Sequence, residues 1–227
     1  DFLKTIEEGI TVLKGFAESA GLSLHTRCVA RFEKKDLSTH NAMEFGCDPD
    51  YNAYTGKFNQ RPEASDPTMR TCGGHIHVGY DTKTAPPEGV VFFMDVLIGL
   101  PLLLTEQEWE RAELYGKLGT YRPKPYGVEY RSASNYWIFD PKLVEFVYEQ
   151  TAKVMQIVAG DLKLDNDLRR QLISQTQAVR EAQEAKLPID VPLDKWCQTL
   201  VEYGLMKPEH AEYLQGLAAA KHDVAAA

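Results

Sequence analysis

The sequence predicts an α+β protein, in which an antiparallel sheet is backed by helices and followed by a helical C-terminal part. Three observations support this prediction. Segments with strand-like alternation are few, long connections separate them, and apolar residues recur at helical spacing from Asp140 onward. The 227 residues suffice for one large domain or for a domain with a helical appendage. We expect a first domain over residues 1–160 and a helical extension over residues 161–227.

The first half of the chain contains one helix and two strands. Apolar residues at helical spacing predict a helix that begins near Phe2 and ends near Gly21. The alternation in "LSLHTRCVARF" predicts a half-buried strand. The stretch from Ala42 to Arg70 is rich in Gly, Pro, Asn and Asp and predicts a long ordered loop, after which "GGHIHVGY" forms a strand.

The second half of the chain begins with an apolar segment, "PEGVVFFMDVLIGLPLLL", which predicts a buried helix with a kink near Pro101. A second long loop follows, and it holds Arg122 and Lys124 between prolines. The segment "GVEYRSASNYW" predicts another strand. Asp140 is expected to cap a helix that has Pro141 at its first position.

Composition argues against several classes of protein. The formal net charge of −8 disfavours a general nucleic-acid binder, because phosphate binding requires a basic surface. The longest apolar run is too short to span a bilayer and carries Asp95, so no membrane partner is expected. Four cysteines without a CxxC pair disfavour a zinc knuckle and a thioredoxin-type site, and predict reduced thiols.

Two histidines share one face of a predicted strand. Residues i and i+2 of a strand point to the same side, so His75 and His77 lie opposite Ile76 and Val78. Gly73 and Gly74 leave room for a ligand or another backbone. An HxH pair alone is a weak signal, because such pairs are more often found on a solvated strand face.

The segment "YRPKPYGVEYR" brings four charged residues together. Glu129 and Arg131 share a strand face, and Arg122 and Lys124 come shortly before them. This composition suits a polyphosphate site, where cations bind phosphate oxygens and a carboxylate binds the bridging metal. A surface ion-pair set is the alternative explanation.

The segment "MEFGCDPD" adds three carboxylates: Glu44, Asp48 and Asp50. A structural Asp-Pro turn explains the two aspartates equally well, whereas Glu44 is a candidate oxygen ligand. Oxygen ligands with a single imidazole favour Mg²⁺ or Mn²⁺ over Zn²⁺. Cations beside such a metal are typical of phosphoryl transfer.

Four motifs in order resemble the phage-type amidoligases: "EFGCDPDYNAYTG", "TCGGHIHVGY", "LYGKLGTYRPKPYGVEYR" and "SNYWIF". These are carboxylate–amine ligases of the glutamine synthetase and glutamate–cysteine ligase superfamily, and the likeness runs from about Leu22 to Gly160. The resemblance implies a curved antiparallel sheet, with helices packed on its convex face and ATP and Mg²⁺ (or Mn²⁺) on its concave face. It also implies that a substrate carboxylate is phosphorylated to an acyl phosphate, which an amine converts to an amide.

The resemblance implies roles for particular residues. His75, Glu129, Glu44 and Asp48 would be metal ligands. The family pattern begins with further acidic residues on earlier strands, and we expect these to lie upstream of Asp1.

The resemblance also implies which residues bind the nucleotide and which act on the substrate or the transferred phosphoryl group. Arg131 would hold the acidic substrate or stabilise charge on the transferred phosphoryl group, and His77 would lie beside the phosphate or substrate. Arg122, Lys124 and Arg70 would bind the nucleotide.

The expected partners are an amino acid or peptide carboxylate, an amine, and further copies of the chain in a homo-oligomer or a virion. The resemblance places the protein in the cytoplasm of a phage-infected bacterial host or in the virion. A non-catalytic virion protein that keeps the fold is the alternative function. A metal-dependent hydrolase that uses the histidine pair is a third and weaker interpretation.

Overall fold

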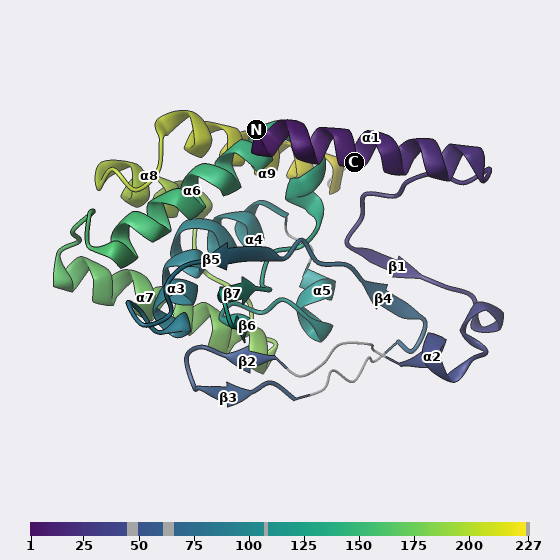
Figure 1. The fold of residues 1–227 in the computed structure, drawn as a ribbon, viewed down its shortest axis with the longest axis horizontal. Coiled ribbons are helices and arrows are strands. Elements are labelled where there is room, and N and C mark those ends of the chain that lie inside the picture. The colour runs from purple at the N-terminus through teal and green to yellow at the C-terminus, as the bar shows by residue number, and fades with distance from the viewer. Residues whose placement is uncertain (45–49, 61–65, 107–108, 226–227) are drawn as a thin grey trace.

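The computed structural model describes residues 1–44, 50–60, 66–106 and 109–225. The α+β prediction is confirmed, with 57% of the chain in helices and 11% in antiparallel strands. Helices gather on one side of a five-stranded sheet, and the long N-terminal helix runs along the edge of the molecule (Figure 1). The helices are α1 (Phe2–Ser19), α2 (His40–Met43), α3 (Pro87–Met94), α4 (Leu100–Glu106), α5 (Trp109–Leu114), α6 (Pro141–Ala159), α7 (Asn166–Ala185), α8 (Leu193–Glu202) and α9 (Pro208–Ala225), with a π-helix η2 (Asp95–Gly99) and 3-10 helices η1 (Lys34–Leu37) and η3 (Tyr136–Phe139).

The main sheet has the strand order β3-β2-β6-β7-β5, and every described pairing in it is antiparallel. Its strands are β3 (Lys57–Phe58), β2 (Tyr51–Asn52), β6 (Thr120–Lys124), β7 (Gly127–Tyr130) and β5 (Ile76–Gly79). A separate two-stranded sheet pairs β1 (Val29–Arg31) with β4 (Met69–Thr71). This small sheet projects away from the helices beneath the far end of α1 (Figure 1).

The register of the central strands sorts side chains into two rows. Tyr130 of β7 pairs with Ile76 of β5 and with Tyr121 of β6, and this buried row belongs to the hydrophobic core. The adjacent residue, Glu129, pairs with His77 and Arg122, and this row lies on the opposite face. The alternation of the pleat therefore separates an apolar face from a polar face.

The central helical stretch, Pro87–Glu106, forms the middle of the core. It is longer than the apolar run suggested. By length and composition alone it could cross a membrane. However, 78% of its most apolar window is buried inside the protein. That burial is typical of a core helix. The predicted irregularity near Pro101 takes the form of the π-helix η2 immediately before α4.

Two predictions about local structure were wrong. Residues 22–27 are not in a strand, and β1 contains only three residues that pair with β4. Much of the segment is exposed, so the alternation has no apolar layer to bury. The segment with Arg122 and Lys124 is the strand β6 rather than a loop. Pro123 is tolerated there because β6 beyond Tyr121 has a described ladder partner only in β7.

The predicted cap of α6 is confirmed. The Asp140 carboxylate accepts hydrogen bonds from the backbone N–H groups of Lys142 and Leu143, and Pro141 takes the first helical position. Helix α7 follows and packs against the core through buried residues such as Leu172 and Val179. The domain boundary at residue 160 stays a prediction.

Candidate active site

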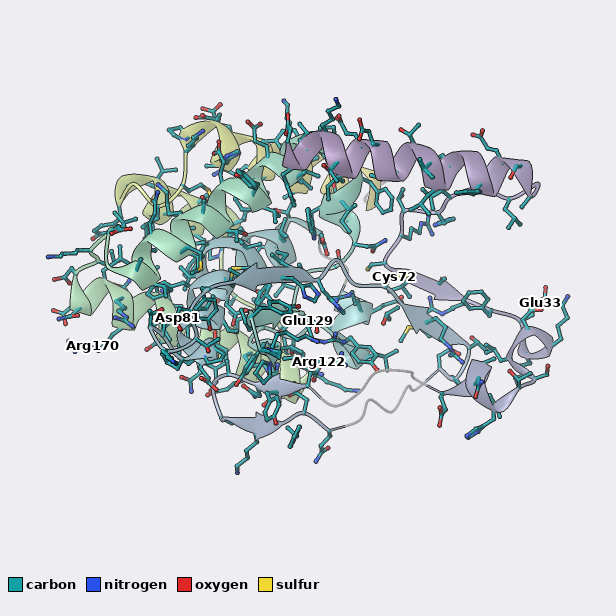
Figure 2. All side chains as sticks on the ribbon, in the orientation of Figure 1. Glu33, Cys72, Asp81, Arg122, Glu129 and Arg170 are labelled. Atoms are coloured by element: carbon teal, nitrogen blue, oxygen red, sulfur yellow. The ribbon has the colours of Figure 1, made fainter. Side chains whose placement is uncertain are left out.

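A buried glutamate, Glu129, lies at the centre of the polar face. Its side chain is only 5% exposed, yet Lys124 donates to it at 2.8 Å and Arg131 donates to it as well. Arg122 completes the group, with its guanidinium 3.9 Å from the same carboxylate. Figure 2 shows Glu129 and Arg122 together in the middle of the molecule. Two cations on β6 and one just after β7 therefore surround one carboxylate.

The surrounding charges decide the ionisation of Glu129. Burial alone would raise the pKa of this carboxyl, but the hydrogen bonds and charges of Lys124 and Arg131 lower the pKa to about 2. Glu129 is therefore an anion at neutral pH, and the cations around it outnumber it. Because the cations outnumber the ionised carboxylate, they can also bind an anionic ligand.

His75 lies beside this cluster, just before β5. Its Nδ1 is 3.2 Å from Oε1 of Glu129 and 3.2 Å from a guanidinium nitrogen of Arg131. Burial and the charge of Arg131 lower the pKa of His75 to about 4. The imidazole is therefore neutral at pH 7, which is the form that binds a metal ion.

A chain of polar contacts links the cluster to α7. Nε of Arg131 donates to Asp50 at 3.2 Å, and Asp50 accepts from Asn59 at 2.9 Å. Asn59 in turn accepts from Arg180 of α7 at 2.6 Å. Arg180 is buried and also donates to Oε1 of Glu184 at 2.7 Å. The site therefore depends on a helix from the C-terminal part of the chain.

One comparison with known proteins identifies the family. The family model described as "Phage phiEco32-like COOH.NH2 ligase-type 2" matches residues 65–187, which is more than half of the chain. The chain belongs to this family. Its name indicates carboxylate–amine ligation, as the resemblance implied. A search of curated proteins and a search of solved structures each found no match.

The match to the ligase family spans the strands that carry the cluster and continues to the end of α7. It includes His75, Glu129 and Arg131, and it also includes Arg180. Asp50 lies outside the matched range, although its carboxylate contacts Arg131.

The other predicted site residues lie in different surroundings. His77 is exposed in the same row as Glu129, and its Nδ1 lies 2.6 Å from the hydroxyl of Tyr126. Arg70 of β4 donates to the backbone carbonyls of Pro67, Met69 and Ala42.

The two acidic candidates of the preceding loop are not part of the described cluster. Glu44 is exposed and its carboxylate lies 3.3 Å from Nε2 of His40, so the structure pairs it with that residue rather than with Glu129. Asp48 lies outside the described residues. Asp50, two residues farther on, is the buried carboxylate that reaches Arg131.

Sequence reasoning missed Arg111 of α5. Its guanidinium is buried and donates to the carbonyls of Cys72 at 2.7 Å, Ser132 at 2.8 Å and Ala133 at 3.1 Å. It thereby joins the segment before His75 to the segment after Arg131. Arg111 lies in a short helix without a recognisable motif, so nothing in the sequence distinguishes it from a surface arginine.

A cavity of about 80 Å³ adjoins the cluster, and its lining includes Asp50, His75, Arg111 and Arg131. Gly73 lies at its edge, where an added Cβ would come 2.6 Å from the His75 ring. A side chain at this position would displace the imidazole, so the glycine leaves the space that the histidine needs. Cys72 also lines the cavity, and its thiol is free.

The described residues do not by themselves form a metal centre. Among them, no group of three or more His, Cys, Asp and Glu side chains could hold a metal ion. Glu129 and His75 are adjacent, but the neighbouring carboxylate of Asp50 is held by Arg131. The arrangement therefore fits an anion, such as a phosphate group, more directly than it fits a metal ion.

Proposed function

We propose that this protein is an ATP-dependent ligase that joins a carboxylate to an amine through an acyl phosphate. The observation that carries the proposal is the cation cluster around Glu129 on the polar face of the sheet. Arg122, Lys124 and Arg131 match the oxygens of a nucleotide polyphosphate in charge, and the membership of a carboxylate–amine ligase family gives the reaction class.

The reaction would proceed in two steps. An oxygen of the substrate carboxylate attacks the γ-phosphorus of ATP, the bond to the β-phosphate oxygen breaks, and ADP leaves. Arg122, Lys124 and Arg131 would stabilise the negative charge on the transferred phosphoryl oxygens. The amine nitrogen then attacks the acyl carbon, phosphate leaves, and the nitrogen loses a proton.

His77 is the proposed acceptor of that proton. It is exposed, it lies in the same row as Glu129 and Arg122, and the hydroxyl of Tyr126 orients its ring. His75 is less suited to this role, because its low pKa of about 4 makes it a weak base.

Mg²⁺ belongs to the proposal as the ion that would neutralise the nucleotide phosphates. Glu129 and His75 are the described residues that would hold it, since one is ionised and the other is neutral at pH 7. Phosphate oxygens, water and residues outside the described part of the chain would have to supply the remaining ligands.

The alternative proposal is a non-catalytic virion protein that keeps the ligase fold. The observation that favours it is the lack of a third metal-binding side chain among the described residues. A buried cluster of unlike charges argues against it, because a scaffold gains little from burying ions that apolar residues could replace.

Trapping of the acyl phosphate tests the proposal without knowledge of the natural amine. The chain is incubated with ATP, Mg²⁺, hydroxylamine and a panel of acidic amino acids and short peptides. We expect a carboxylate-dependent hydroxamate and an equal amount of ADP. With ¹⁸O in the substrate carboxylate, the released phosphate should carry one ¹⁸O atom.

The matched control is Glu33→Gln, an exposed glutamate far from the cluster in Figure 2 that pairs with Lys35. Glu33→Gln should keep the hydroxamate signal that Arg131→Met loses. If ATP binds but no carboxylate yields hydroxamate or labelled phosphate, the acyl-phosphate mechanism is wrong. If ATP does not bind either, the non-catalytic alternative is favoured.

A further inference from the structure

A cleft distinct from the Glu129 cluster lies between α5 and the end of α7. Its volume is about 480 Å³, several times that of the cavity beside Arg131, and it is large enough for a small organic molecule. Apolar side chains form much of its wall: Ala112, Leu187, Pro188 and Ile189. Leu187 is 62% exposed, so apolar surface is open to solvent there.

Two lysines, Lys117 and Lys186, line the same cleft. Among the described residues, neither ammonium group has a hydrogen-bond or ion-pair partner. Lys117 is half-buried, and burial together with the charges of Arg180 and Lys186 lowers its pKa, although the charges of Glu184 and Asp50 oppose the shift. Each lysine thus lies within the electrostatic influence of the other, and an anion between them would relieve their repulsion.

Glu184 is the one acidic side chain in the described lining of the cleft, and its charge offsets the repulsion on Lys117 only in part, since the pKa of that lysine stays lowered. Oε1 of Glu184 accepts from Arg180 at 2.7 Å and from Asn52 at 3.2 Å, so its carboxylate is already engaged with α7 and the sheet. The cleft therefore presents cationic groups beside an apolar wall, and its own carboxylate is directed to other partners.

The backbone holds one of the lysines in an unusual conformation. Lys186 ends α7 with φ of 56°, and it is the only described residue other than glycine with a positive φ. Glycine is the common residue at such a helix end, because a side chain is disfavoured there. The N–H of Leu187 donates to Ala182 at 2.9 Å and fixes the turn. A functional role for the lysine side chain would explain why glycine does not occupy this position.

We propose that this cleft binds a small organic carboxylate with an apolar body. The carboxylate contacts the ammonium groups of Lys117 and Lys186, and the apolar body lies against Leu187, Pro188 and Ile189. The site lies beside the Glu129 cluster, because Lys117 follows the segment Tyr115–Gly116 that lines the cavity there. Binding in the cleft does not depend on the proposed ligase reaction.

Calorimetric titration with octanoate tests the site, and octylamine is the matched probe with the same chain and the opposite charge. We expect octanoate to bind to the full chain and octylamine to bind at least about tenfold more weakly, because only the anion pairs with the lysines. Lys117→Met and Lys186→Gly should each weaken octanoate binding about tenfold. Leu187→Asp should abolish it.

Lys186→Gly separates binding from folding. Glycine suits the left-handed turn, so this variant should unfold at the same or a higher temperature while it loses octanoate affinity. Lys195→Met, at an exposed lysine of α8, is the control and should bind as the unmodified chain does. The proposal is overturned if octanoate does not bind, if octylamine binds equally well, or if Lys117→Met and Lys186→Gly keep full affinity.

Discussion

Two carboxylates on opposite sides of the sheet show how partners decide the state of a buried acid. Glu129 lies on the polar side among cations, and its pKa is lowered to about 2. Asp95 of the π-helix lies on the core side, and it accepts hydrogen bonds from the hydroxyls of Tyr54 and Tyr130, each at 2.7 Å. Burial raises the pKa of Asp95 to about 6, although these hydrogen bonds oppose the shift.

The adjacent residues Glu129 and Tyr130 thus serve opposite purposes. The glutamate belongs to a cluster that can exchange its partners for a ligand. The tyrosine helps to hold a carboxylate that has only neutral donors and no space around it, since a Cβ added at Gly99 would lie 2.0 Å from the Tyr130 hydroxyl. Excess cationic charge is what makes the first cluster a candidate site, whereas the second is a structural contact between a helix and the sheet.

The largest expected effect is on turnover. Glu129→Gln should lower metal-dependent hydroxamate formation about a thousandfold, because it removes the charge that orders the cations. The variant should remain folded, with a lower thermal midpoint that inorganic phosphate partly restores. Hydroxamate assays and thermal denaturation with and without phosphate measure both effects. Unchanged turnover would remove Glu129 from the site.

The next effect is the pH dependence of the free energy of unfolding that Asp95 causes. Its folded pKa is raised from 3.8 to about 6, so its contribution to stability is fully present below pH 3.8 and is lost as the pH rises to about 6. The loss at pH 7 is about 3 kcal/mol. Asp95→Asn should remove this decline, and urea unfolding between pH 4 and pH 7 measures it. A decline of the same size in the variant would show that another group titrates.

The opposite sign is expected at Glu129. Its folded pKa is lowered from 4.5 to about 2, so its contribution is present above pH 4.5 and is lost as the pH falls toward 2. Unfolding curves of the chain and of Glu129→Gln should therefore converge between pH 4.5 and pH 2. If they stay parallel through this range, the cations do not stabilise the ionised carboxyl.

A smaller effect is expected at the partly exposed cation of the cluster. Lys124→Met should weaken ATP binding about tenfold, the contribution of one charge-assisted hydrogen bond. The variant should also unfold more easily, because Glu129 is 5% exposed and loses one of its charged partners. Calorimetric titration with ATP measures the change, and Lys57→Met of β3, an exposed lysine on the edge strand, is the control. Equal loss in both variants would indicate a general charge effect.

The smallest effect on the site should come from the core side, where a substitution changes stability but not ligand affinity. Tyr130→Phe removes one hydroxyl donor from Asp95 and leaves that of Tyr54, so unfolding should become easier by about 1–2 kcal/mol. ATP affinity should not change, because Tyr130 faces away from the cation cluster. A fall in ATP affinity would mean that the two sides of the sheet are coupled.

Part of the site was predictable because strand periodicity is local. Residues i and i+2 of a strand point to the same side, and this rule correctly placed Glu129 and Arg131 on one face. The same rule placed His75 on the face opposite Ile76, and His75 contacts Glu129 in the structure. The α+β class and the family followed from element order and motifs. The choice between Asp48 and Asp50 was not predictable, because both lie in one loop and only the path of that loop decides which carboxylate meets Arg131.

Periodicity and motif spacing thus carry the fold class, the family and the residues of the polar face, since these depend on neighbours along a strand. The tertiary structure alone decides which distant groups complete the site and the core. Arg180 reaches Asn59 across 121 positions, and Tyr54 reaches Asp95 across 41. Such contacts form because buried polar groups must find partners, and only the packing of α7 and η2 against the sheet determines which partners are within reach.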